Sequence, residues 1–178
     1  MSQKVTYLFA GQGSQYIGMG KDLYETFPES KAIFDRADKA LGFSISKLCF
    51  EGPQQELTQT ANCQPAILTV SIAAFEAFKA VLRFRFSVLG YVAGLSLGEY
   101  SALVAAGAMS FDDAVYLVRR RGEFMEEEAR KIPGKMLSII GLDTDKVRKI
   151  CATTNTEIAN FNCPGQIVAS GSNLGIEK

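Results

Sequence analysis

The sequence predicts an α/β protein in two parts. In the first part, apolar strand-like segments at 4–9 and 88–94 each run into a glycine-containing turn and then into helices, which is the order of parallel strands covered by helices. After Ile132-Pro133-Gly134 the pattern changes to strand, helix, strand and strand. We therefore assign residues 1–131 to a larger N-terminal domain and residues 132–178 to a smaller domain.

Helix-breaking residues divide the helical segments of the larger domain. Pro28, Gly42 and Gly52-Pro53 interrupt the apolar periodicity, and prolines and glycines are poorly tolerated inside helices. Ser110 is placed to cap the last of these helices. The expected strands lie at 4–9 and 88–94, and the expected helices lie at 22–27, 29–41, 54–59, 65–82, 99–106 and 111–130.

The smaller domain begins like a split β-α-β fold. Its expected elements are strands at 135–141, 157–162 and 166–171 and a helix at 145–152. A ferredoxin-like plan needs one more helix, beginning near residues 173–178, and one more strand. We expect the C-terminus to be a truncation, because a sheet without its last strand and covering helix exposes an edge and an apolar face.

Composition and charge exclude several classes of partner. Nineteen basic and nineteen acidic residues balance, so we expect no broad basic surface for nucleic acid. The N-terminus has no secretory signal pattern, and charged residues such as Glu76 and Lys79 interrupt the apolar run at 65–81. We therefore expect a cytoplasmic protein with a core helix and no membrane span. Without histidine or a Cys-x-x-Cys pair, the four cysteines are expected to be free thiols, with no metal site.

Ser96 lies in the pattern Gly94-Leu95-Ser96-Leu97-Gly98, between an apolar strand and a helix. A G-x-S-x-G sequence in this context is typical of a nucleophile elbow, where a strained turn projects the serine hydroxyl clear of the sheet. The backbone N–H of Leu97 then lies at the helix N-terminus, where negative charge is favoured. Ser96 is therefore a candidate nucleophile, although an ordinary buried serine in a strand-to-helix turn has the same pattern.

A second glycine-rich turn, Gly11-Gln12-Gly13-Ser14-Gln15, follows the first strand. In a parallel sheet both turns lie at the carboxyl ends of the strands, where ligands bind. The backbone N–H of Gln12 is therefore the best candidate for a second oxyanion donor facing Leu97. A dinucleotide-binding fingerprint is disfavoured, because it requires glycine at the position of Tyr16 and an acidic strand end downstream.

Arg121 falls on the apolar side of its predicted helix. At about 100° per residue it lies near the centre of an apolar arc, whereas Arg119 and Arg120 fall outside that arc. The arc consists of Ala114, Val115, Leu117, Val118, Phe124 and Met125. A core-facing arginine needs an anion. The two alternatives are a structural ion pair with an acidic residue such as Glu99 and a bidentate contact to the carboxylate of a substrate.

Five motifs, in order, resemble those of the malonyl-CoA:acyl-carrier-protein transacylases. They are GQGSQ after the first strand, NCQPAILT before the long helix, VAGLSLGEYSALVAAGA at the elbow, RRRGEFM in the next helix and NFNCPGQ in the smaller domain. The resemblance covers nearly the whole chain. It implies an α/β-hydrolase-like large domain with an inserted ferredoxin-like small domain.

The resemblance also implies a reaction and its residues. A malonyl group would pass from malonyl-CoA to Ser96 and then to the phosphopantetheine thiol of acyl carrier protein, in fatty acid or polyketide synthesis. The backbones of Gln12 and Leu97 would hold the oxyanion, and Arg121 would bind the malonyl carboxylate. No cofactor is implied besides the coenzyme A thioester, which is the substrate.

The sequence departs from this family in two places. It contains no histidine, whereas the family activates its serine with a histidine located downstream of where this sequence ends. It also has Leu95 where the family usually has a histidine that is not the general base, whereas Leu97 is typical of malonyl-selecting members. The alternatives to an active transferase are therefore a serine esterase or thioesterase, and a fragment or inactive relative that only binds an acyl carrier or another subunit.

Overall fold

The computed structural model describes residues 5–82 and 89–178, which form two compact units, 1–125 and 126–178. The boundary between the units falls inside α7 (Phe111–Lys131). The domain boundary expected between residues 131 and 132 instead coincides with the end of that helix. The two units are described separately.

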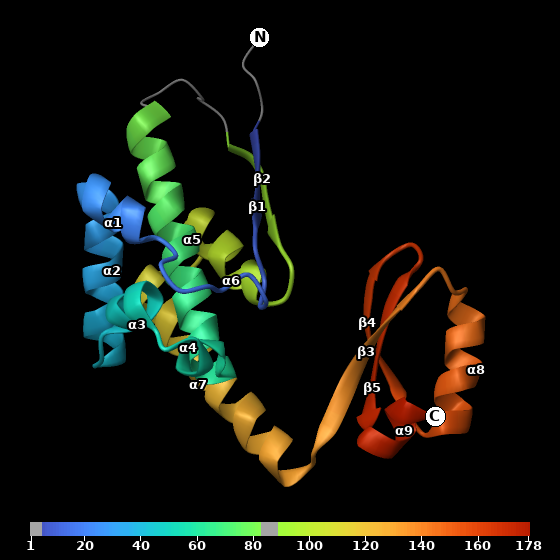
Figure 1. Ribbon diagram of the computed structural model, residues 1–178. Helices are drawn as coiled ribbons and strands as arrows, with labels where there is room; N and C mark the ends of the chain where they lie inside the picture. The colour runs from blue at the N-terminus through green and yellow to red at the C-terminus, as the bar shows by residue number, and fades with distance from the viewer. Residues whose placement is uncertain (1–4, 83–88) are drawn as a thin grey trace. The chain divides into compact units, whose positions relative to one another are not determined.

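The N-terminal unit contains a two-stranded parallel sheet, formed by β1 (Val5–Phe9) and β2 (Leu89–Gly94) (Figure 1). Position 9 pairs with position 94 at the carboxyl ends of the two strands. The turns that follow the strands therefore lie side by side, as the sequence predicts. A Cβ added to Gly11 would lie 2.9 Å from the carbonyl oxygen of Leu95, so the two turns touch.

Helices account for most of the N-terminal unit. In chain order they are α1 (Lys21–Thr26), α2 (Pro28–Leu41), α3 (Ile45–Glu51), α4 (Gln54–Thr58), α5 (Thr60–Leu82), α6 (Leu97–Ala105) and α7. Figure 1 shows α5 running through the middle of this unit, and α2, α3, α4 and α6 pack against it. Leu68 and Ile72 of α5 and Val115 of α7 belong to its buried core. By length and composition alone α5 could cross a membrane. It is instead the core helix that the sequence predicts, because it buries Gln64 and Thr69 within the folded unit.

One helix of this unit was not expected from the sequence. Helix α3 begins after Ser44, whose Oγ accepts a hydrogen bond from the backbone N–H of Lys47 at 3.2 Å. The carboxylate of Asp38 accepts another from the backbone N–H of Ser46 at 2.9 Å. These contacts satisfy amide groups that have no partner within a helix. A seven-residue helix has too few turns to give a clear periodic signal.

Helix α5 begins at Thr60, whereas the expected start was residue 65. Pro65 lies inside the helix and cannot donate to the carbonyl of Ala61, four residues earlier. Arg119 of α7 donates to that carbonyl through Nη1 at 3.1 Å. A tertiary contact therefore supplies a donor to a carbonyl to which Pro65 cannot donate.

The C-terminal unit has the expected order of strand, helix, strand and strand. Its elements are β3 (Gly134–Ile140), α8 (Thr144–Thr154), β4 (Glu157–Cys163), β5 (Gln166–Ser172) and α9 (Asn173–Glu177). The sheet is antiparallel, in the order β3-β5-β4. Its small core includes Val147 and Cys151 of α8 and Ile167 and Ala169 of β5. The helix expected to begin near residue 173 is present as α9.

Candidate active site

Ser96 occupies a strained turn between β2 and α6, as the sequence predicts. Its backbone angles are φ 54° and ψ −102°, and it is one of two non-glycine residues with positive φ in the described part of the chain. Such a conformation is costly for a residue with a side chain and persists only where the surrounding structure imposes it. The side chain is exposed. The turn therefore presents the Ser96 hydroxyl to the outside of the unit.

The glycines on either side of Ser96 allow the close packing that imposes this turn. A Cβ at Gly94 would lie 2.1 Å from the carbonyl carbon of Gly98. A Cβ at Gly98 would lie 2.4 Å from the carbonyl oxygen of Phe9, at the end of β1. Both distances are far below van der Waals contact, so any larger residue at either position would push α6 away from the sheet.

The two candidate oxyanion donors belong to the turns that touch. Leu97 is the first residue of α6, and the first N–H groups of a helix have no acceptor within it. Gln12 lies in the turn after β1, which two local hydrogen bonds hold: Gly13 N–H to Gln15 Oε1 at 2.9 Å, and Ser14 Oγ to the Gly11 carbonyl at 3.0 Å. The fold thus brings both turns to one edge of the sheet, while the role of these two amides stays a prediction.

Arg121 reaches Ser96 from α7. Its Nη2 donates to Ser96 Oγ at 2.9 Å, and its Nη1 donates to Gln64 Oε1 at 2.7 Å. Both acceptors are neutral. Within residues 5–82 and 89–178, no carboxylate pairs with Arg121. The guanidinium next to the candidate nucleophile therefore forms no ion pair with a carboxylate of the described residues.

The predicted alternative of an ion pair between Arg121 and Glu99 does not form. The carboxylate of Glu99 instead accepts a hydrogen bond from the backbone N–H of Ser96 at 3.1 Å. A carboxylate three residues into a helix commonly reaches back in this way to cap its first turn. Glu99 thus helps to hold the elbow and leaves Arg121 available for another anion.

The predicted apolar arc of α7 is wrong in part. The buried residues of the helix are Phe111, Ala114, Val115, Val118 and Gly122. Leu117, Phe124 and Met125 are 43%, 55% and 46% exposed. The buried stripe is therefore narrower than the sequence suggested, and Arg121 lies half-buried at its margin. This position suits a residue that must meet a ligand, because a fully buried guanidinium could not reach one.

Three residues around the site were not predicted from the sequence. Gln64 is fully buried and holds Arg121, and Asn62 accepts a hydrogen bond from Arg119 through Oδ1. Asn62 and Gln64 precede a long apolar run, and polar residues beside Pro65 could have signalled a tertiary role. Arg119 was placed outside the apolar arc, yet it joins α7 to the first turn of α5. Which residue it would contact could not be read from the spacing.

Comparison with known proteins places the chain in a family. Residues 6–178 match the sequence pattern of the acyl transferase domain. The chain belongs to this family. It is 51% identical to a malonyl CoA-acyl carrier protein transacylase of Bacillus subtilis strain 168, over 98% of this chain and 55% of that protein.

Solved structures agree with this assignment. The malonyl CoA-acyl carrier protein transacylase of Coxiella burnetii superposes with a TM-score of 0.89 at 38% identity, over 99% of this chain and 56% of that one. A malonyl-transacylase in complex with its type II PKS acyl-carrier protein superposes with a TM-score of 0.87 at 37% identity, over 98% and 57% of the two chains. These structures share the mixed α/β fold of this acyl transferase chain. The chain spans about half the length of the relatives it matches.

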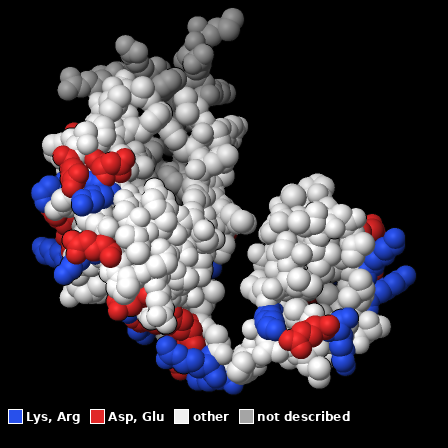
Figure 2. Space-filling view, in the orientation of Figure 1, with Lys and Arg blue, Asp and Glu red and all other residues white. Residues whose placement is uncertain are grey.

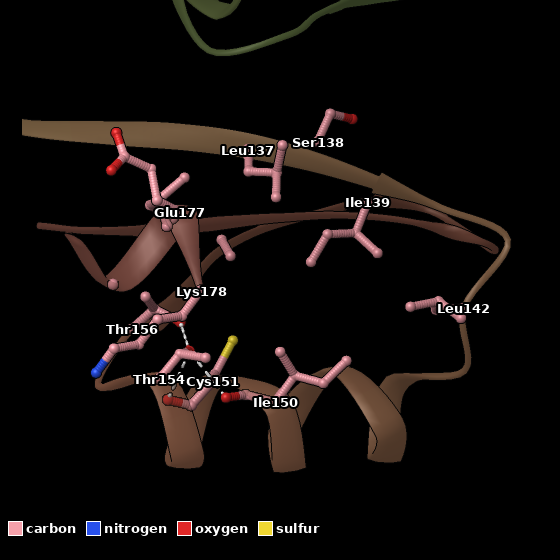
Figure 3. A pocket seen from close by; sticks show the side chains of 13 residues that line it. Leu137, Ser138, Ile139, Leu142, Ile150, Cys151, Thr154, Thr156, Glu177 and Lys178 are labelled. Carbon is pink, nitrogen blue, oxygen red and sulfur yellow. Dashed lines mark hydrogen bonds between the residues drawn. The ribbon is translucent and has the colours of Figure 1, made fainter. Parts of the chain in front are cut away.

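The C-terminal unit of this acyl transferase chain contains a separate cavity of about 440 Å³. Figure 3 shows Leu137 and Ile139 of β3 facing Ile150 and Cys151 of α8 across it. The hydroxyls of Thr154 and Thr156 lie 2.9 Å apart, within hydrogen-bonding distance of each other. The cavity is lined mainly by apolar groups, so it suits apolar packing better than a polar ligand. The Ser96 site and this cavity lie in different units.

Surface charge on the N-terminal unit is mixed. Figure 2 shows acidic and basic side chains next to one another on this unit, with uncharged surface between them. Lys31 pairs with Asp35 at 3.1 Å, and Arg36 pairs with Asp112 at 3.2 Å. On the face that Figure 2 shows, side chains of both signs are therefore interspersed.

Proposed function

We propose that this chain supplies the nucleophile and the substrate-binding arginine of a malonyl-CoA:acyl-carrier-protein transacylase, working in fatty acid or polyketide synthesis. The observation that carries the proposal is the contact between Arg121 Nη2 and Ser96 Oγ at 2.9 Å. An arginine that forms no ion pair within the described part of the chain, next to a serine at a nucleophile elbow, suits an acyl group that itself carries a carboxylate. The similar proteins named as malonyl CoA-acyl carrier protein transacylases support the same substrate.

The proposed reaction has two acyl transfers. In the first, Ser96 Oγ attacks the thioester carbonyl of malonyl-CoA, and the C–S bond breaks after a tetrahedral oxyanion has formed. The serine proton passes to a base and then to the departing coenzyme A thiolate. In the second, the phosphopantetheine thiol of acyl carrier protein gives up its proton and attacks the acyl-serine, and Ser96 recovers a proton as the ester breaks. The backbone N–H groups of Gln12 and Leu97 are proposed to stabilise both oxyanions.

The base for these steps is proposed to come from residues outside this sequence. A serine hydroxyl is a weak nucleophile without a partner that accepts its proton, most often a histidine. The 178 residues contain no histidine. The relatives extend well beyond the part that this chain matches, and their remaining length is the proposed source of that base.

The proposal also covers the architecture of the two domains, the partners and the cellular location. The parallel pair β1-β2 with its elbow supports an α/β-hydrolase-like large domain, proposed as residues 1–131. The order β3-β5-β4 with α8 supports a ferredoxin-like small domain inserted in it, proposed from residue 132 onward. Malonyl-CoA and acyl carrier protein are the proposed partners, with no cofactor, nucleic acid or membrane, and the cytoplasm is the proposed location.

A second candidate is a chain that binds acyl groups or a carrier protein without transferring them. The absence of histidine favours it. A serine esterase or thioesterase gains no support from the site, because water as the acceptor gives Arg121 no evident task. The three functions differ in what happens to an acyl group on Ser96: transfer to carrier protein, loss to water, or no acylation.

The experiment uses a completed enzyme, defined as this chain joined to the C-terminal part of the Bacillus subtilis relative that it does not match. The completed enzyme is incubated with malonyl-CoA, and its intact mass is measured before and after addition of carrier protein. We expect a malonyl adduct that is absent in Ser96→Ala, present in the control Ser138→Ala, whose serine is exposed on β3 of the other unit, and passed to the carrier. Hydrolysis without transfer would support the esterase, and no adduct would support a binding role.

A further inference from the structure

The side chain of Gln64 is buried in the N-terminal unit, with both ends of its amide bonded. Its exposed fraction is 0%. Oε1 accepts a hydrogen bond from Arg121 Nη1 at 2.7 Å, and Nε2 donates to the sulfur of Met125 at 3.3 Å. A leucine would fill this position in a helix core without desolvating an amide. The amide is therefore best explained by its short contact to the guanidinium.

The contact controls where Arg121 points. A guanidinium is planar, and its N–H groups form a rigid fork. When Gln64 Oε1 holds Nη1, the direction of Nη2 is restricted as well, and Nη2 is the atom that donates to Ser96 Oγ. Loss of the Gln64 contact would leave the long arginine side chain free to take other rotamers.

The contact also preserves the charge of Arg121. An amide oxygen accepts a hydrogen bond without neutralising the donor, whereas a carboxylate at the same place would form an ion pair. The described residues provide Arg121 with two neutral acceptors, Gln64 Oε1 and Ser96 Oγ, and with the ring of Tyr100 at 5.9 Å from Cζ. A carboxylate on a substrate thus meets a guanidinium that is already oriented toward Ser96 and that forms no ion pair with a described residue.

Close packing of α5 and α7 fixes the distance between the two residues. A Cβ at Gly122, next to Arg121, would lie 2.6 Å from the Cα of Ala61 and 2.6 Å from the carbonyl oxygen of Thr60. The two helices can approach this closely only because residue 122 has no side chain. Arg121 is thereby brought within direct reach of Gln64, one turn further along α5.

We propose that Gln64 is a positioning residue. It fixes the direction of the Arg121 guanidinium without forming an ion pair with it, and the site therefore selects acyl groups that carry a carboxylate. This inference rests on the proposed function, because it concerns the preference of the same site for malonyl over uncharged acyl groups. Gln64 acts through Arg121 and contacts neither the serine nor the proposed substrate.

The test compares variants of the completed enzyme by kcat/KM with malonyl-CoA and with acetyl-CoA. Gln64→Glu should lower malonyl transfer about ten- to hundredfold, because the new carboxylate competes for Arg121, and should leave acetyl transfer within about threefold. Gln64→Met keeps an unbranched side chain of similar length. It should lower malonyl transfer by about tenfold, chiefly through a higher KM, since the charge remains but its direction is lost.

Thr69→Val is the matched control. Thr69 is also fully buried on α5, and its Oγ1 donates to the carbonyl of Pro65 at 2.7 Å, away from Arg121. This variant should leave the ratio of malonyl to acetyl transfer unchanged. If the Gln64 variants lower both substrates in proportion, as a purely structural residue would, the inference is overturned. Gln64→Met decides the matter if Gln64→Glu does not fold.

Arg121→Ala separates this inference from the function on which it rests. If Arg121→Ala abolishes the preference for malonyl and the Gln64 variants leave it intact, the positioning role of Gln64 is wrong and the proposed function stands. If Arg121→Ala itself leaves the preference unchanged, the proposed function is wrong. If the Gln64 variants and Arg121→Ala all lose the preference for malonyl-CoA, while Thr69→Val folds normally and keeps it, the inference is supported.

Discussion

Nη2 of Arg121 lies 2.9 Å from Oγ of Ser96, although 25 positions separate the two residues in the sequence. The serine oxygen is an acceptor in this contact, so its own proton remains available to a base. When an acyl group is attached to Oγ, the same guanidinium lies within reach of a carboxylate a few bonds beyond the ester. A single contact thus links the candidate nucleophile to the candidate selectivity residue.

Arg121 should control the choice of acyl group more than the rate of acyl transfer itself. In the completed enzyme, Arg121→Ala is expected to lower kcat/KM for malonyl-CoA by about ten- to hundredfold and to spare acetyl-CoA, because a charge-assisted bidentate contact contributes roughly 1.5–3 kcal/mol. Arg121→Lys should recover only part of the loss, since ammonium lacks the planar fork. An equal loss for both substrates would assign Arg121 a structural role instead.

The 178-residue chain alone should turn over slowly. Without a base, the Ser96 hydroxyl loses most of its activation, a deficit on the order of thousandfold or more. The measurement is malonyl transfer to carrier protein by the isolated chain and by the completed enzyme under the same conditions. Comparable turnover by the two proteins would show that a base exists within these residues.

Gly98 should be intolerant of any side chain. Its added Cβ would meet the carbonyl oxygens of Phe9 at 2.4 Å and Ala10 at 3.0 Å, both of which belong to the backbone. We expect Gly98→Ala to lower the free energy of unfolding by about 2–3 kcal/mol, measured by urea denaturation. Gly107→Ala is the control, because its Cβ would meet nothing within 4 Å and only its positive φ costs about 1 kcal/mol. Equal losses in both variants would contradict the packing argument.

The stability of the chain should fall at alkaline pH because of Cys49. Burial, helped by the negative charge of Asp38, raises the pKa of the Cys49 thiol to about 12. The unfolded chain releases this proton above about pH 8.5, whereas the folded chain retains it. The unfolded state therefore binds fewer protons, and the free energy of unfolding should fall by up to about 1.4 kcal/mol per pH unit between about pH 8.5 and 12.

Urea denaturation at pH 7.5 and 9.5 measures this slope. Cys49→Ala should be less stable at pH 7.5, because it leaves a cavity, but should lose less stability between the two pH values. Cys163→Ala is the control for removal of a thiol at an exposed position. A slope that is the same in all three proteins would show that Cys49 does not carry the effect.

Local sequence features determined most of the elements and the elbow. Gly94, Ser96 and Gly98 predict a strained strand-to-helix turn, because only small residues allow a helix to begin so close to a strand end. The strand–helix–strand–strand order of the C-terminal unit followed from alternating apolar patterns and the turn at Pro164-Gly165. Such features depend on neighbours in the chain, so the sequence alone was sufficient for them.

Only the tertiary structure decided how the site around Ser96 is built. Arg121 was expected on a core-facing stripe, but its half-buried position and its bonds to Gln64 and Ser96 depend on how α7 crosses α5. That crossing depends on Gly122, whose role appears only when another helix lies against it. The partners of a long polar side chain are set by which elements meet in space, and periodicity along one helix carries no information about its neighbours.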